Sequence, residues 1–302
     1  MQVCEIGIGR YPPAVIANVN DTVLRVLRGL SDAWVRHAVL VDDEGKLAGM
    51  ISARDVVSFL GGGARFRIVE EEYEKDLYKA LRSVRAHELS YVAPRIRCED
   101  EFSRVIEIML EKGVGALTVI DSNSRPIGVI SERHIMALFA DVRTNVYVRE
   151  VMSSPLLSMR PEEPLIRGMR LMISRHIRRV PLIEEGKLCG ILTIKDVVAF
   201  FSSVSTQRRL REEGTEGVWL TPLSFLGAKR VATVSVDEDI GHAIRIMRDL
   251  GVGSLVVVDR EGWPIGMFTE RDVITKLPKL EGVEVFVDEI ERRIVAERVY
   301  FR

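Results

Sequence analysis

The sequence predicts an α+β protein built from four tandem copies of one β-α-β-β-α unit. Three observations predict it: a short terminal motif occurs four times, an apolar run precedes each motif, and an amphipathic helix precedes each run at a constant distance. A repeat at a fixed period is typical of folds built from tandem copies of one unit. With 302 residues and 47% hydrophobic content, the chain is long enough for about two globular bodies.

The terminal motif is a Gly, two mostly apolar residues, a hydroxyl residue, a variable residue, a basic residue and a polar residue. It occupies residues 49–55 (GMISARD), 128–134 (GVISERH), 190–196 (GILTIKD) and 266–272 (GMFTERD). The apolar runs before it are residues 39–41, 119–120, 181–183 and 256–258, each followed by an acidic residue and a turn. We interpret each run and each motif start as a pair of buried strands joined by a hairpin.

An amphipathic helix is predicted upstream of each strand pair. The four helices start at Val23, Phe102, Leu165 and Ile240, and each start lies 15 residues before Ala38, Leu117, Val180 and Leu255, respectively. Apolar residues recur in these segments at helical spacing. A second helix is expected directly after each motif, for example over residues 56–60 and 197–201.

The spacing of the copies indicates two pairs. Gly49 and Gly190 are 141 positions apart, and Gly128 and Gly266 are 138 apart. We place the four domains at residues 10–60, 87–141, 148–202 and 217–276. Long linkers, 61–86 and 203–216, lie inside the pairs. The alternating pattern of the tail, 277–302, predicts a strand pair that covers a sheet edge.

Composition restricts the class of partner and the location. The net charge of −1 and the pI of about 6.6 give no global basic surface, so neither nucleic acid nor a membrane is an expected partner. Cys4, Cys98 and Cys189 are far apart and lack metal-ligand spacing, which predicts reduced thiols in a cytoplasmic protein. No stretch approaches 18 apolar residues.

Nothing in the sequence indicates catalysis. The five histidines form no H-E-x-x-H spacing, and no G-x-x-x-x-G-K-[ST] phosphate loop occurs. We expect no catalytic residue, no metal and no catalytic cofactor.

From about residue 10 to residue 276 these motifs resemble the cystathionine-β-synthase (CBS) domain family. The four-copy layout is similar to archaeal CBS proteins and to the gamma subunit of AMP-activated protein kinase. The resemblance implies that two CBS pairs pack as a pseudo-symmetric disc whose clefts bind AMP, ADP or ATP as a regulatory ligand. It also implies an energy-sensing module that acts on a protein partner.

The motif carries groups suited to a nucleotide. A carboxylate can accept both hydroxyl protons of a ribose, and the candidates are Asp55, Asp196 and Asp272. The preceding basic residues, which can reach phosphate, are Arg54, Arg133, Lys195 and Arg271. The hydroxyl residues at the helix starts, where phosphate is also favoured, are Ser52, Ser131, Thr193 and Thr269. A helix-capping role without a ligand is the alternative.

The second copy differs, because His134 stands where the carboxylate is expected. A neutral imidazole cannot accept two hydroxyl protons. We predict that this site is empty or altered.

The resemblance implies that the partner copy lines the adenine pocket. Asp272 would then work with Leu157 and Ile177, Asp196 with Ala232, Val252 and Ser254, and Asp55 with Pro94 and Val114. Ordinary core packing is the alternative for these residues. It also implies phosphate-binding roles for Arg36, His37, Arg178 and Arg179, which come from alternate copies. A solvated surface is the alternative for them.

The leading hypothesis is therefore an adenine-nucleotide sensor, and not an enzyme. S-adenosylmethionine or another adenosyl ligand, a ligand-free scaffold, and an unrecognised enzyme are the alternatives. The sequence leaves open the protein partner and whether the protein is a monomeric disc or a homodimer.

Overall fold

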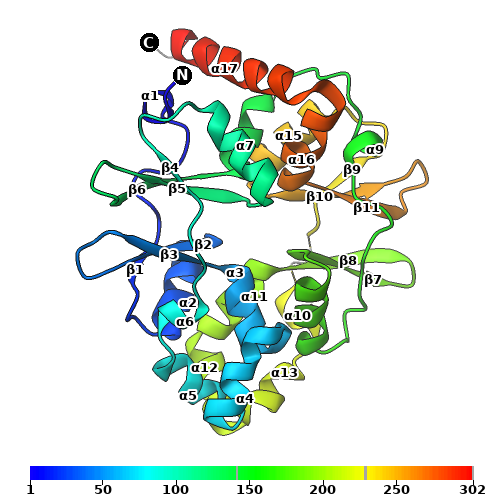
Figure 1. Ribbon diagram of the computed structural model, residues 1–302. Helices are drawn as coiled ribbons and strands as arrows, with labels where there is room; N and C mark the ends of the chain where they lie inside the picture. Colours follow the sequence, from blue (N-terminus) through cyan, green and yellow to red (C-terminus); the bar gives the residue numbers. More distant parts are fainter. Residues whose placement is uncertain (141, 228–229, 301–302) are drawn as a thin grey trace.

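The computed structural model describes residues 1–140, 142–227 and 230–300 (Figure 1). Residue 141, at the end of the second predicted domain, and residues 301–302 of the tail lie outside them. Four small sheets each pack against helices, in the order that the repeat predicts. The strands are β1 (Ile16–Asn18), β2 (His37–Val41), β3 (Leu47–Ser52), β4 (Arg95–Arg97), β5 (Ala116–Ile120), β6 (Pro126–Ser131), β7 (Arg179–Glu184), β8 (Lys187–Thr193), β9 (Thr233–Ser235), β10 (Ser254–Val258) and β11 (Pro264–Thr269).

The first copy shows the unit. Strand β1 pairs in parallel with β2, which pairs antiparallel with β3, so that Val39 lies between Ile16 and Met50. The same topology occurs in copies two and four. In copy three the leading strand is reduced to a bridge between Met159 and Leu182 beside β7 and β8. The β-α-β-β-α prediction is confirmed.

The crossover helices are α2 (Val23–Asp32), α7 (Ser103–Lys112), α10 (Leu165–Ser174) and α15 (Ile240–Asp249). Three start at the predicted residue. Phe102 is instead the N-cap of α7, one position before the helix. Helix α2 begins where the Thr22 side chain accepts a hydrogen bond from the Arg25 amide. The helices after the motifs are α3 (Ala53–Val57), α8 (Glu132–Met136), α11 (Ile194–Ser202) and α16 (Glu270–Glu281).

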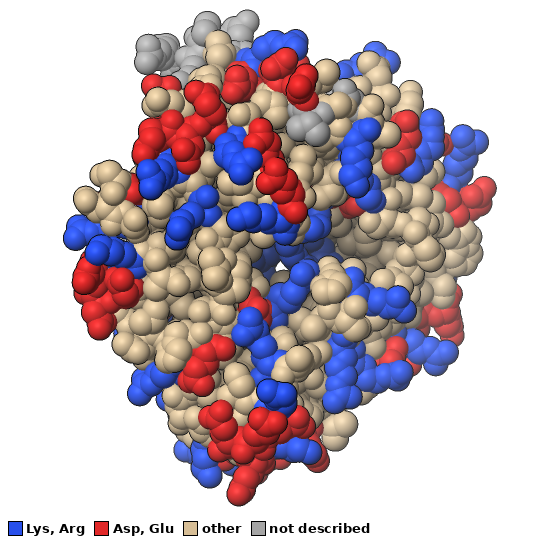
Figure 2. Space-filling view, in the orientation of Figure 1, with Lys and Arg blue, Asp and Glu red and all other residues tan. Residues whose placement is uncertain are grey.

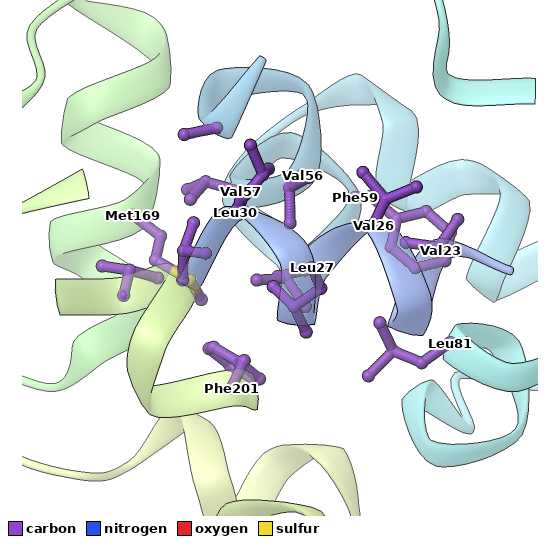
Figure 3. Close-up of a cluster of buried hydrophobic side chains, with 14 of the residues drawn as sticks. Val23, Val26, Leu27, Leu30, Val56, Val57, Phe59, Leu81, Met169 and Phe201 are labelled. Atoms are coloured by element: carbon purple, nitrogen blue, oxygen red, sulfur yellow. The ribbon is translucent and has the colours of Figure 1, made fainter. Parts of the chain in front are cut away.

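Two large cores join copies that are not adjacent in sequence. The first buries helices of copies one and three together, with Leu27 and Leu30 of α2 near Met169 of α10 and Phe201 of α11 (Figure 3). The second does the same for copies two and four. Within each pair the sheets face each other across the middle (Figure 1). Between copies one and two they are joined by a small cluster of Val39, Met50 and Ala93. This confirms the disc of two pairs.

The linkers form helices that extend the first core. They contain α4 (Arg67–Tyr73), α5 (Leu77–Ser83), α12 (Val204–Glu212) and the start of α13 (Gly214–Trp219), with a short turn at Ala64–Phe66. A turn at Ser58–Gly62, α6 (Ala86–Leu89) and α14 (Leu223–Leu226) lie at the edges of the linkers or beyond them. Gly61 has φ of 118° and lies against the Trp219 ring, so a side chain there would overlap the indole. The indole Nε1 donates to the Leu60 carbonyl at 2.8 Å. The remaining short elements are α1 (Val3–Ile6), a turn at Ala137–Phe139 and α9 (Val148–Val151).

The predicted strand pair in the tail is wrong. Helix α17 (Val283–Tyr300) follows α16 directly. Phe286, Ile290 and Ile294 are four residues apart and are buried in the second core, where Phe286 stacks on Phe139. The tail thus has apolar residues at the two-residue spacing of a strand and at the four-residue spacing of a helix. The helix forms because it buries the second set in the core.

The prediction of three reduced thiols is also wrong. Cys4 forms a disulfide with Cys98, while Cys189 is free. Helix α1 lies beside the segment after β4, where the Val3 amide donates to Asp100 and the Cys4 amide to Cys98. The sequence separation of 94 between the two cysteines concealed this proximity. No helix among the described residues has the length and apolar character needed to cross a membrane.

Thiol titration tests the disulfide. Denatured but unreduced protein should expose one reactive thiol, Cys189, and reduction should raise the number to three. Cys98→Ser should lower the free energy of unfolding by about 2–4 kcal/mol, because the unfolded chain is no longer cross-linked. Cys189→Ser is the control and should leave the reduction-dependent change intact. Three reactive thiols before reduction would rule the cross-link out.

Candidate functional site

Each terminal motif caps the helix that follows it. In copy three the Thr193 amide and hydroxyl both donate to Asp196 Oδ2, at 2.7 and 2.6 Å. Ser52 with Asp55 and Thr269 with Asp272 repeat this arrangement. In copy two the Ser131 amide donates to His134 Nδ1 at 3.1 Å. The capping role considered from the sequence is present, and it occupies one of the two carboxylate oxygens.

The second carboxylate oxygen, Oδ1, distinguishes the three aspartates. Arg65 Nη2 lies 3.0 Å from Asp55 Oδ1. Asp272 Oδ1 receives Lys276 Nζ at 2.7 Å and the Ser153 hydroxyl at 2.9 Å. Asp196 Oδ1 has no partner among the described residues. Burial raises the pKa of Asp196 above its ordinary value, against the effect of the Thr193 hydrogen bonds. Asp196 therefore retains a free acceptor.

Asp196 lines a cavity of about 550 Å³ where the four copies meet. This volume is in the range of small-molecule sites, about 300–1,000 Å³. The predicted site residues that line it are Arg36, His37, Ser131, Arg133, Arg178, Arg179, Thr193, Lys195, Asp196, Ala232, Val252 and Ser254. The structure thus brings together Asp196 and the three residues predicted for its adenine pocket.

The other predicted residues lie outside this lining: Ser52, Arg54, Asp55, Pro94, Val114, Leu157, Ile177, Thr269, Arg271 and Asp272. Pro94 is buried, Leu157 is exposed, and Ile177 packs against the first core. Val114 packs against the second core. The groups predicted around Asp55 and Asp272 are therefore separate from the cavity of Asp196.

The basic residues of the motifs connect opposite pairs. Arg54 donates to the carbonyl of His176, Arg133 to Gly251, Lys195 to Trp34 and Arg271 to Gly113. All four acceptors have positive φ and hold the same position after a crossover helix. Copies one and three, and copies two and four, exchange these bonds reciprocally. The basic residues predicted to reach phosphate thus also fix the helix ends of a facing copy.

Two buried glutamates escaped the sequence analysis. Arg36 Nη2 lies 2.7 Å from Glu270 Oε2, and Arg178 Nη1 lies 3.0 Å from Glu132 Oε2. Both glutamates occupy the variable position of the motif, which is Ala53 or Ile194 in the other two copies. The signal was an alternation, with arginine in copies one and three and glutamate in copies two and four. Gly115 and Gly253 leave room for these side chains.

The cavity carries more positive than negative charge. Seven Arg or Lys side chains and two carboxylates line it, and Figure 2 shows basic side chains around a hollow at the centre of one face. Burial lowers the pKa of Arg179 to about 10. Burial and nearby cations lower the pKa of Lys195 to about 8. The Arg179 side chain makes no hydrogen bond and no close ion pair among the described residues, although the charge of Glu270 acts on it. An anion would compensate this charge.

The described residues contain no group of three or more His, Cys, Asp or Glu side chains that could hold a metal ion. Burial and the neighbouring Arg36 hold the pKa of His37 well below its ordinary value, so this residue is neutral at pH 7. The lining of the cavity combines cations and hydrogen-bond donors with two carboxylates and with apolar residues such as Ala232 and Val252.

Removing the charge of Glu270 should destabilise the protein. Burial opposes ionisation of this side chain, but Arg36 and Arg179 outweigh it and hold the pKa of the carboxyl below its ordinary value. Glu270→Gln leaves these arginines uncompensated, so the free energy of unfolding should fall by about 3–5 kcal/mol in chemical denaturation at pH 7. The control Glu99→Gln, at an exposed pair, should cost less than about 1 kcal/mol.

The pH dependence of stability follows from the same shift. Because the folded-state pKa of Glu270 is depressed, its contribution is present above the ordinary value of 4.5 and is lost as the pH falls through the folded value. The difference in stability between wild type and Glu270→Gln should therefore narrow on acidification. A constant difference between pH 7 and pH 3 would contradict the assigned role of the carboxylate.

Comparison with known proteins agrees with the repeat. The family model of the CBS domain matches residues 8–62, 75–141, 148–203 and 226–279. An uncharacterized 33.4 kDa protein in a ribosomal RNA operon of Thermofilum pendens is 43% identical over 302 residues, the full length of both chains.

The fold has a similar solved structure. Protein MJ1225 of Methanocaldococcus jannaschii, described as a candidate archaeal homologue of g-AMPK, superposes with a TM-score of 0.83. It is 23% identical, and the match covers 91% of this chain and 99% of that one. A conserved protein of Pyrococcus horikoshii gives a TM-score of 0.55 at 17% identity, covering 91% and 98% of the two chains. The family match spans most of the chain in four copies, and the chain therefore belongs to the CBS domain family.

Proposed function

We propose that this protein is a regulatory adenine-nucleotide-binding protein that takes AMP, ADP or ATP in the cavity at Asp196. The observation that carries the proposal is the free Oδ1 of Asp196 in a cationic cavity that also contains Ala232, Val252 and Ser254. The proposal includes no catalytic activity.

Each part of the nucleotide has a matching surface. The Asp196 carboxylate accepts hydrogen bonds from the ribose hydroxyls, because Thr193 occupies only Oδ2. Ala232 and Val252 offer apolar contact to the adenine ring. Arg179 and Lys195 supply positive charge for the phosphates, and their lowered pKa values reflect a site in which cations are buried close together.

Asp55 and Asp272 are weaker candidates for ribose. A ligand at Asp55 must displace Arg65, and a ligand at Asp272 must displace Lys276 and Ser153. Ion pairs that are partly buried cost free energy to break. The proposal therefore places the highest affinity at Asp196.

Regulation would act through the packing of the copies. Arg36, His134, Asp196 and Ser254 line the cavity and come from copies one, two, three and four, respectively. A ligand held by all four copies favours the arrangement in which they fit it best. A coupling of about 1–3 kcal/mol would suffice to change the affinity for a protein partner. A single chain completes this cavity, so the proposal needs only a monomeric disc.

The cationic cavity favours a phosphate-bearing ligand over S-adenosylmethionine, whose sulfonium is positive. Calorimetric titration with AMP, ADP, ATP and S-adenosylmethionine separates these possibilities. Tighter binding of S-adenosylmethionine would support the adenosyl alternative, and silence with all four ligands would support the scaffold.

Asp196→Asn should weaken adenine-nucleotide binding roughly 10-fold to 100-fold, since it removes hydrogen bonds to a charged acceptor. Thr193 remains the N-cap, and the asparagine oxygen can still accept a hydrogen bond from the Thr193 amide, so the melting temperature should change little. Asp76→Asn, the same substitution at the N-cap of α5 outside the cavity lining, is the control and should bind as wild type does. Equal nucleotide affinity in wild type and Asp196→Asn would refute the assignment of the ribose to this carboxylate.

A further inference from the structure

The cavity contains a second half that is equivalent to the Asp196 half but has different chemistry. Ser131, Arg133 and His134 hold the motif positions of Thr193, Lys195 and Asp196. His37 starts β2 as Ser254 starts β10. All of these residues line the same cavity. One half therefore presents a carboxylate and the other an imidazole.

The hydrogen bonds of His134 determine what its ring can offer. The Ser131 amide is a donor, so His134 Nδ1 must be the acceptor and carries no hydrogen. The neutral ring then carries its hydrogen on Nε2, for which the described residues provide no acceptor. Burial and the neighbouring Arg133 lower the pKa of His134, which favours this neutral form. The His134 half thus offers a donor where the Asp196 half offers an acceptor.

Two further cations, Arg10 and Arg36, act on His134, and so does the Glu270 carboxylate that pairs with Arg36. The Arg10 backbone pairs with Val129 through two hydrogen bonds, 2.9 and 3.0 Å, which bring Arg10 to the cavity. Its side chain has no partner among the described residues. Arg36 Nη1 is buried and has no hydrogen-bond partner within the described part of the chain. A buried donor without a partner is costly, and an anion at this position would satisfy it.

We propose that the His134 half binds the terminal phosphates of the nucleotide whose ribose lies at Asp196. The cavity then holds one nucleoside triphosphate that spans both halves, and not two nucleotides. This inference rests on the proposed function for the Asp196 half, while the anion site at His134, Arg10 and Arg36 rests on its own contacts. It makes ATP a tighter ligand than AMP.

The probe for the anion site is inorganic tripolyphosphate, titrated calorimetrically into nucleotide-free protein alongside adenosine, AMP and ATP. His134→Asp is the sharpest variant, because an aspartate caps the helix in the other three copies and the change replaces a donor by a negative charge. Arg10→Gln is a second variant that leaves the cap untouched. Asn20→Asp, at an exposed turn, adds the same charge outside the cavity lining and is the control.

We expect wild type and Asn20→Asp to bind tripolyphosphate equally, and His134→Asp to bind it at least roughly 10-fold more weakly, as lost charged hydrogen bonds imply. ATP should lose affinity to the same extent, and AMP should not. Asp196→Asn should weaken adenosine and AMP but leave tripolyphosphate unchanged. Arg10→Gln should lower the affinity for tripolyphosphate and ATP only.

Unchanged tripolyphosphate and ATP binding in both His134→Asp and Arg10→Gln would overturn the inference. Two AMP molecules in the cavity, one lost with Asp196→Asn and the other with His134→Asp, would also overturn it. Failure of the proposed function looks different: adenosine, AMP and ATP would be indifferent to Asp196→Asn, while tripolyphosphate would still depend on His134.

Discussion

The diagonal contacts between arginine and glutamate at the centre of the disc are the interaction on which the rest of the structure depends. The cluster around Val39 joins copies one and two, and the bridge of Ser153 with Met267 joins three and four. The helical cores join one with three and two with four. Arg36 with Glu270 and Arg178 with Glu132 connect the remaining combinations, one with four and two with three. Each glutamate opens a helix, where its charge is favoured by the helix dipole. Every copy therefore contacts every other copy.

These contacts also determine the charge of the cavity. Two glutamates neutralise only part of the basic side chains that four copies bring to one point. The buried Arg179 shares Glu270 with Arg36, and the exposed side chain of Arg10 has no hydrogen bond or ion pair among the described residues. Buried cations in excess are unfavourable without a counter-charge. The arginines and glutamates that hold the two pairs together thus leave net positive charge in the cavity where all four copies meet. A polyanion could bind there.

The sequence predicted the repeat, the pairs and most helix starts because these depend on local periodicity that occurs four times. The resemblance to the CBS family implied that Asp196, Ala232, Val252 and Ser254 would lie together, and the structure places all four in the lining of one cavity. Glu132 and Glu270 were missed because they occupy the one variable position of the motif. The ion pairs depend on the alternation at this position, where copies two and four have glutamate and copies one and three do not. The sequence did not predict the ion pairs of Asp55 with Arg65 and of Asp272 with Lys276. They depend on the conformations of long side chains outside the motif.

Contacts that are distant in sequence explain the two corrections. The tail became α17 because Phe286, Ile290 and Ile294 meet the second core, and Cys4 meets Cys98 because α1 packs beside β4. Neither partner is visible in local patterns.

The most direct test of the account is a crystal structure of the protein with bound ATP. The account predicts ribose hydroxyls within hydrogen-bond distance of Asp196, adenine beside Ala232 and Val252, and phosphates that reach toward Arg36 and His134. ATP bound at Asp55 or Asp272, with the cavity at Asp196 left without nucleotide, would contradict it.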